Sequence, residues 1–147
     1  MFILLLSEDS VMVIMAVDLG KARTGIAACD KTEYLAYPVD VITEHKRDVL
    51  LEKVALKAKE LGAELTVVGL PKNMDGTEGE SALSAREFGE RFTETTGIEV
   101  VMWDERCTTI TAHGYMNDTN TRGKKRKAVI DKVAAVVILQ SFLDSRR

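Results

Sequence analysis

The stretch VMVIMAVDLGKARTGIAACD, residues 11–30, decides the fold of this chain. Val11 to Val17 is an apolar run that predicts a buried strand, and the carboxylate Asp18 follows directly. Gly20 allows a tight turn, and TGIAACD, residues 24–30, predicts a second strand that returns antiparallel to the first. An acid at the end of a buried strand needs a reason, which makes Asp18 the first candidate functional residue.

The sequence after this hairpin predicts one more antiparallel strand. EYLAYPVDVI, residues 33–42, has strand composition. Pro38 lacks the N–H that a sheet ladder needs, so this strand is expected at an edge of the sheet or with a bulge. Three strands in quick succession indicate an antiparallel meander.

The remainder of the chain alternates helical and strand patterns. The expected elements are a helix over about 51–61 ended by Gly62, a strand over 64–70, a helix capped by Ser81 and ended by Gly97, a strand over 98–103, a short helix from Thr108 or Thr109 to about Met116, and a last helix over about 128–143. Strands connected by helices pair in parallel. The predicted fold is therefore an α/β mixed sheet of five strands with helices on both faces.

The length and composition indicate a folded, intracellular protein. At 147 residues with 46% apolar and 29% charged residues, the chain fits a single domain over 1–147, with 1–10 an extra N-terminal segment. Cys29 and Cys107 form no disulfide framework, which favours free thiols in a reducing compartment. No run approaches the roughly 18 apolar residues that span a membrane. We therefore expect a cytoplasmic protein without a membrane partner.

The charge is unevenly distributed along the chain. Residues 1–120 contain 12 Lys and Arg and 21 Asp and Glu, a balance of −9, whereas residues 121–147 contain 8 and 2, a balance of +6. Most of that excess lies in RGKKRK, residues 122–127. Such a segment is either a solvated loop or a local phosphate-binding patch.

Three acidic positions end or begin predicted elements. Asp18 ends the first strand, the pair Asp104 and Glu105 ends the fifth, and Asp131 lies in the first turns of the last helix. Asp131 shares a helix face with Ala134, Ala135 and Ile138, where a charge is out of place without a partner. If the first and fifth strands are parallel neighbours, these acids gather at one edge of the sheet, where ligand sites of open α/β sheets form.

Clustered carboxylates without a basic partner repel one another, and divalent cations relieve that repulsion. Mg²⁺ or Mn²⁺ takes oxygen ligands, and two such ions support attack of water on a phosphodiester. The acids therefore indicate a metal-dependent nuclease. Each acid also has a simpler interpretation, because Asp18 could end a plain turn, Glu105 could pair with Arg106, and Asp131 could interact with a helix dipole.

Four segments together resemble a known family. IMAVDLGKARTGIA, VVGLPKNMDGTEGESA, DERCTT and IDKVAAVVILQSFL resemble the YqgF/RuvX family of ribonuclease H-like proteins, in order and in approximate spacing, over nearly the whole chain. The resemblance implies a ribonuclease H-like fold and a metal-dependent nuclease site. It also implies action in maturation of the 5′ end of 16S ribosomal RNA, within ribosomal precursor particles. The family has also been named a Holliday junction resolvase, which makes branched DNA the alternative substrate.

Carried over by position, the resemblance makes Asp18, Glu105 and Asp131 the catalytic acids and the metal ligands. Strand alternation puts Asp104 and Glu105 on opposite faces, so one of them is the ligand. The resemblance favours Glu105, and Asp104 is the alternate. Cys107 departs from the aliphatic residue that the family usually has there.

Basic and polar residues near these acids are expected to contact nucleic-acid phosphates, without base specificity. Lys21 and Arg23 follow Asp18, and Lys72 and Asn73 lie in the loop after the fourth strand. That loop could equally be a plain turn whose Glu78 and Glu80 favour the start of the next helix. The remaining candidates are Arg106, Arg122, Lys124, Lys125, Arg126 and Lys127. The last five precede Asp131 closely, which favours phosphate binding over a solvated loop.

Two other function classes remain open. DLGKARTGIA also looks like the phosphate-binding hairpin of actin-like ATPases and sugar kinases, but that fold has two related domains and needs far more than 147 residues. The other class is a noncatalytic nucleic-acid-binding or ribosome-associated module that keeps the fold. The complete set of acids argues against it.

Overall fold

The computed structural model describes residues 12–30, 35–106 and 123–146, and for residues 123–132 it describes the backbone only. The strands are β1 (Ile14–Asp18), β2 (Arg23–Cys29), β3 (Ala36–Thr43), β4 (Leu65–Leu70) and β5 (Glu99–Asp104). The helices are α2 (Arg47–Leu61), α3 (Glu80–Thr96) and α5 (Gly123–Ser145). The predicted short helix near 108–116 and the N-terminal segment 1–10 lie outside the described residues.

The five strands form one mixed sheet in the order β3-β2-β1-β4-β5. β1 pairs antiparallel with β2 and β2 with β3, whereas β1 pairs parallel with β4 and β4 with β5. The predicted meander and parallel strands are confirmed. β3 is an edge strand, and its register with β2 shifts between Ile26 and Ala27, opposite Pro38, as its missing N–H predicts.

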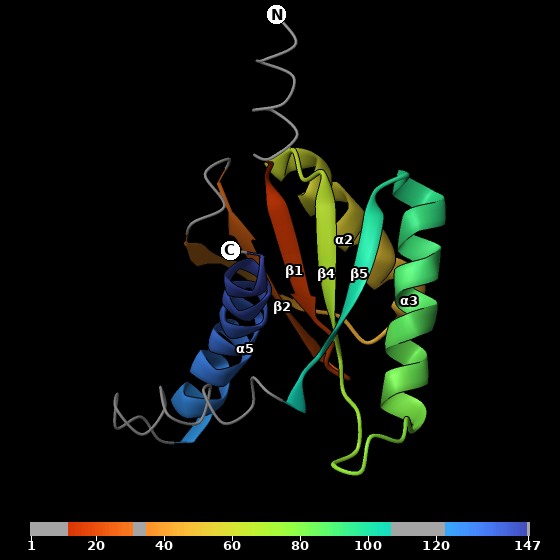
Figure 1. Cartoon of the computed structure of the whole chain (residues 1–147), viewed down its shortest axis with the longest axis vertical. Coiled ribbons are helices and arrows are strands. Elements are labelled where there is room, and N and C mark those ends of the chain that lie inside the picture. Colours follow the sequence, from red (N-terminus) through yellow and green to blue (C-terminus); the bar gives the residue numbers. More distant parts are fainter. Residues whose placement is uncertain (1–11, 31–34, 107–122, 147) are drawn as a thin grey trace, which may run out of the picture.

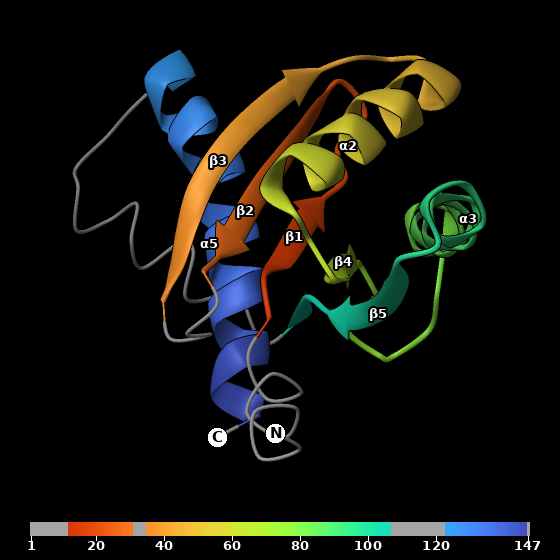
Figure 2. The ribbon, with the colours of Figure 1, turned by 90° about the horizontal axis from the view of Figure 1, so that it is seen from above.

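The helices cover both faces of the sheet, α2 and α3 on one and α5 on the other (Figures 1 and 2). Alternation along β1 divides the core accordingly. Met15 and Val17 pack in the core beneath α2 and α3, whereas Ile14 and Ala16 pack in the core beneath α5. In the described part of the chain no helix is both long and apolar enough to cross a membrane.

Three helix starts differ from the prediction. α2 begins at Arg47 rather than near residue 51. α3 begins at Glu80 with Gly79 as its N-cap, so the predicted cap Ser81 is wrong. α5 begins at Gly123 rather than near residue 128. Gly123 to Lys127 therefore begin a helix rather than form a loop, since Lys and Arg are good helix formers. Arg122 lies outside the described residues.

The parallel strands fix where ligand chemistry can occur. The carboxyl ends of β1, β4 and β5 lie at one end of the sheet, and α5 begins at that same end (Figure 1). The loop over residues 71–79 and the turn over residues 19–22 leave the sheet there as well.

Candidate active site

Asp18 is the last residue of β1 and pairs in register with Gly25 of β2. It continues the alternation of Ile14 and Ala16, so it lies on the α5 face of the sheet. The turn after it requires glycine, because a Cβ on Gly20 would collide with the carbonyl of Arg23. The hairpin thus holds the half-buried Asp18 at the carboxyl end of the central strand β1.

Glu105 directly follows β5. Its backbone N–H donates to the carbonyl of Leu70 in β4 at 3.1 Å, which extends the parallel ladder by one residue. Val101 and Trp103 of β5 pack on the α5 face, and Glu105 continues that alternation. Its side chain crosses Gly69 of β4, where an added Cβ would lie 2.9 Å from Cδ of Glu105.

Asp18 and Glu105 meet across β4. Burial raises the pKa of the Glu105 carboxyl to about 8, and the neighbouring Asp18 contributes through its charge and through a hydrogen bond between the two side chains. Without a cation, Glu105 therefore holds a proton at neutral pH. The sequence analysis supposed that the first and fifth strands are neighbours, but β4 lies between β1 and β5. The two acids still meet, because Gly69 of β4 leaves room for the Glu105 side chain.

Asp104 has a different role from Glu105. The Arg106 guanidinium donates to both carboxylate oxygens of Asp104, from Nε at 3.1 and 2.9 Å and from Nη2 at 2.6 Å. These hydrogen bonds hold the pKa of Asp104 below its usual range. Asp104 is thus neutralised by Arg106, while Glu105 faces another acid.

Asp131 lies within α5, seven residues before Ile138. Its side chain is outside the described ones. Ile138 packs directly over Gly69, since its Cδ1 would lie 2.8 Å from a Cβ there. Seven residues are two helical turns, about 10 Å along the axis. The backbone of Asp131 therefore lies on the same stripe of α5 as Ile138, nearer the carboxyl end of the sheet.

The donor set fits a hard divalent cation. Two carboxylates converge where one is forced to keep a proton, and a cation there would replace that proton and cancel the repulsion. Among the side chains that the structure describes, no group of three or more His, Cys, Asp or Glu residues gathers. The third predicted acid, Asp131, is outside that search.

The predicted phosphate-binding residues fall into two groups near this edge. Lys21 is exposed in the β1–β2 turn, and Arg23 is the half-buried first residue of β2. Lys72 and Asn73 lie in the loop over residues 71–79, which Arg106 reaches with a hydrogen bond from Nη1 to the carbonyl of Met74 at 3.4 Å.

That loop has its own internal structure. Asn73 donates through Nδ2 to the hydroxyl of Thr77 at 2.8 Å, and that hydroxyl donates to Asp75 at 2.6 Å. Lys72 lies 4.0 Å from Glu78, which also forms a two-point ion pair with Arg86. The side chains of Lys124, Lys125, Arg126 and Lys127, and the whole of Arg122, are outside the description.

A family model described as "RuvX: Holliday junction resolvase" matches residues 12–145. This chain belongs to the RuvX family. A relative from Bacillus thuringiensis (strain Al Hakam), named "Putative pre-16S rRNA nuclease", is 39% identical over 137 residues, which cover 92% of this chain and all of the relative. A Bacillus cereus (strain G9842) protein of the same name matches equally. The predicted membership in a nuclease family is confirmed.

Solved structures confirm the fold. Thermus thermophilus RuvC in complex with a Holliday junction substrate superposes with a TM-score of 0.60 at 12% identity, over 92% of this chain and 95% of that one. The fowlpox virus Holliday junction resolvase gives 0.55 at 13% identity, over 91% and 99%. The RuvX family member therefore has the ribonuclease H-like fold that the sequence predicted.

Two residues that shape the edge were absent from the sequence-based prediction. The sequence pattern assigns Gly69 only to the fourth strand, although a glycine inside VVGL signals a close approach by another group. Arg47 was not singled out, and its Nη1 donates to the carbonyl of Gly20 at 3.4 Å. The pattern gave no signal for Arg47, because its contact depends on how α2 packs against the turn.

Proposed function

We propose that this RuvX family protein is a divalent-metal-dependent endonuclease that hydrolyses phosphodiester bonds, acting in 5′-end maturation of pre-16S ribosomal RNA. The observation that carries the proposal is the meeting of Asp18 and Glu105 across Gly69, with the pKa of Glu105 raised to about 8. Two acids crowded at the carboxyl end of a parallel sheet destabilise the fold. Such strongly shifted pKa values cluster at functional sites, which favours a catalytic role for this pair.

Asp18 and Glu105 would hold Mg²⁺ or Mn²⁺, with Asp131 as the third acid from α5. The bound cation supplies Lewis-acid stabilisation of charge developing on the phosphate and lowers the pKa of water in the site. Asp104 would act indirectly, by orienting Arg106 through their ion pair at 2.6 Å. Because the two acids lie between packed elements, they are held in place before substrate arrives.

The basic residues named above would contact the nucleic-acid backbone. Phosphate contacts position a strand without reading its sequence. Arg106 and the loop over residues 71–79 are joined through the carbonyl of Met74, so this loop is suited to orient the strand beside the acids. We propose cytoplasmic ribosomal precursor particles as the setting.

Pre-16S RNA is favoured over branched DNA because the relatives that match the chain at 39% identity are named for that substrate. The second candidate function is Holliday junction resolution, which the printed description of the family favours. The likeness to the solved resolvases supports the fold alone, since identity is 12–13%.

The test compares the full chain with Asp18→Asn on end-labelled precursor 16S RNA and on a four-way DNA junction. Both are incubated with Mn²⁺ or Mg²⁺ and with EDTA. We expect metal-dependent cleavage of the RNA by the wild type and none by Asp18→Asn. Cleavage of the junction alone would replace the first function with the second. Binding of either substrate without cleavage would favour the noncatalytic module, and phosphate release from ATP without nucleic acid would favour the ATPase reading.

A further inference from the structure

A pocket opens at the carboxyl end of β1, on the opposite face of the sheet from the paired acids. It has a volume of about 210 Å³ and lies between the turn after β1, the start of α2 and the first turns of α3. Leu19 and Ala85, which line it, belong to the core beneath α2 and α3. The pocket and the acids therefore flank one edge of the sheet.

Two cationic side chains line this pocket, Lys21 and Arg47. Within the described ranges, Lys21 has no hydrogen-bond or ion-pair partner. Arg47 is half-buried and uses one guanidinium N–H on the carbonyl of Gly20 at 3.4 Å. A guanidinium carries five such donors, so Arg47 is anchored to the turn with donors to spare.

The start of α3 adds further donors to the same pocket. Its N-cap is Gly79, which makes no side-chain capping hydrogen bond, so the first-turn N–H groups lack that acceptor. The hydroxyl residues Ser81 and Ser84 line the pocket beside them. The positive end of the helix dipole favours an anion there. The cations and the helix terminus thus point to the same class of ligand.

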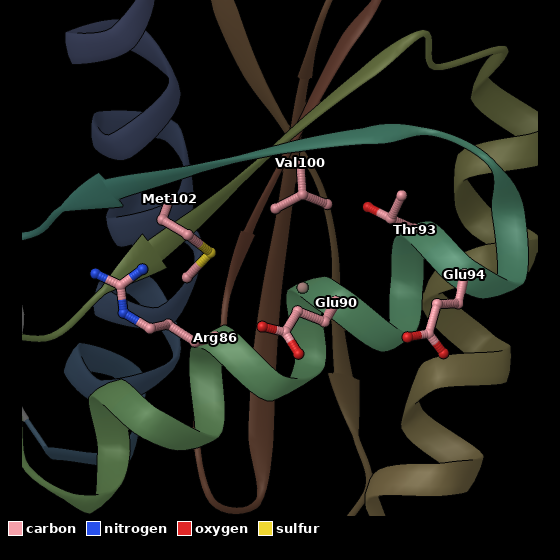
Figure 3. A pocket seen from close by; sticks show the side chains of 7 residues that line it. Arg86, Glu90, Thr93, Glu94, Val100 and Met102 are labelled. Carbon is pink, nitrogen blue, oxygen red and sulfur yellow. The ribbon is translucent and has the colours of Figure 1, made fainter.

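Glu80 also lines the pocket and is the one acid there. It is exposed, so its carboxylate can turn to solvent. The larger pocket, about 400 Å³ between α3 and β5, has the opposite character. Glu90 and Glu94 line it, as does the cation Arg86 (Figure 3). Arg86 already pairs with Glu78. Of these two pockets, only the one beside β1 is suited to a phosphate.

We propose that the pocket lined by Lys21, Arg47, Ser81 and Ser84 binds a backbone phosphate of the strand that is cut, close to the scissile one. This rests on the proposed nuclease function. Gly20 follows Asp18 by two residues, a span of at most about 7 Å. The acids and the pocket are therefore joined by one short turn at the same end of the sheet. One strand can therefore pass over the edge with one phosphate at the acids and a nearby one in the pocket.

The test measures equilibrium binding of fluorescently labelled precursor 16S RNA to the full chain between 50 and 200 mM salt, by anisotropy. Two variants address the pocket by different means. Arg47→Gln removes a cation, and Ser84→Asp adds a negative charge. Ser84→Asn is the neutral match for the aspartate, and Lys53→Gln removes a cation that pairs with Glu44 outside the pocket. All are checked for folding by circular dichroism.

We expect Arg47→Gln to lower the salt slope by about 0.7–0.9, the effect of losing one phosphate contact. Ser84→Asp should weaken binding about tenfold and more than its neutral match Ser84→Asn does, while Lys53→Gln stays within twofold of wild type. In cleavage, the two pocket variants should raise KM with kcat unchanged. Unchanged binding and slope in both folded pocket variants would overturn the proposal, as would a wild type that binds no RNA. Loss of binding in these variants from a wild type that never cleaves would keep the pocket and remove the nuclease function.

Discussion

The side chain of Glu105 crosses the backbone of Gly69, so that a Cβ on Gly69 would lie 2.9 Å from Cδ and 3.0 Å from Cγ of Glu105. Because Gly69 has no side chain, Glu105, which directly follows β5, can reach Asp18 at the end of β1 across the strand between them. Ile138 of α5 closes the same space from above, 2.8 Å from that Cβ position. The site therefore depends on a missing side chain as much as on the acids.

Gly69→Ala is expected to lower metal-dependent cleavage at least tenfold. The added methyl must displace Glu105 or Ile138, and Ile138 is held in the core. Overpacking of this kind costs about 1–3 kcal/mol. Cleavage rate and urea unfolding measured on the same preparation check the prediction.

Gly89→Ala is the matched control. Its Cβ would lie 3.1 Å from Cγ1 of Val100 and 3.2 Å from Sδ of Met102, in the packing between α3 and β5. Alanine gains helix propensity inside α3 and crowds this packing, so the variant changes stability away from the acids and should keep the cleavage rate of its folded fraction. Equal loss of activity in the two variants would mean that Gly69 acts through stability alone.

The raised pKa of Glu105 predicts a specific dependence of stability on pH. The group titrates near 4.5 when unfolded and near 8 when folded, so between these values the native state binds more protons than the unfolded state. The contribution of this group to the free energy of unfolding of the metal-free protein therefore falls as pH rises from 4.5 to 8, by at most roughly 5 kcal/mol. Urea unfolding of wild type and Glu105→Gln, compared across that range, isolates the effect. A difference between the two proteins that stays constant with pH would contradict it.

Divalent metal should reverse that penalty. A ligand that binds only the native state raises the melting temperature, and its affinity rises with pH where a carboxyl must lose a proton. We expect Mn²⁺ to raise the Tm of wild type more at pH 8 than at pH 6. Asp18→Asn and Glu105→Gln should lose most of this shift, and Asp104→Asn should keep it. A full Mn²⁺ shift in Glu105→Gln would remove Glu105 from the metal site.

Arg106→Ala is expected to loosen the loop over residues 71–79. Arg106 donates hydrogen bonds both to Asp104, at the end of β5, and to the carbonyl of Met74 in the loop. Without the Arg106 side chain, this link between the loop and β5 is lost. Hydrogen exchange of the amides of residues 72–77 should become faster, while exchange in α2 is unchanged. Equal exchange in wild type and variant would show that the hydrogen bonds within the loop are sufficient.

Much of this fold could be predicted because local patterns determine it. Alternation assigned Asp104 and Glu105 to opposite faces, and Pro38 indicated an edge strand with an irregularity. The predicted helix starts are wrong where tertiary contacts outweigh the capping preference of a single side chain. Ser81 is a good cap by type, but Glu78 pairs with Arg86 and the helix begins one residue after Gly79.

The site could be predicted as a set of acids but not as an arrangement. Strand order is not encoded in any local pattern, so the position of β4 between β1 and β5 required the structure. Gly69 and Arg47 gained meaning only from that order and from the packing of α2. The role of the Asp131 side chain as the third acid stays a prediction. The backbone of α5 that carries it passes close to the site.

The most direct test of the central claim compares Glu105→Gln with Asp104→Asn in Mn²⁺-dependent cleavage of precursor 16S RNA. The two residues are adjacent and both acidic, but Glu105 meets Asp18 whereas Asp104 binds Arg106. We expect Glu105→Gln to lose at least a hundredfold in kcat and Asp104→Asn to stay within tenfold of wild type. Cleavage retained by Glu105→Gln and lost by Asp104→Asn would contradict the assignment of the site.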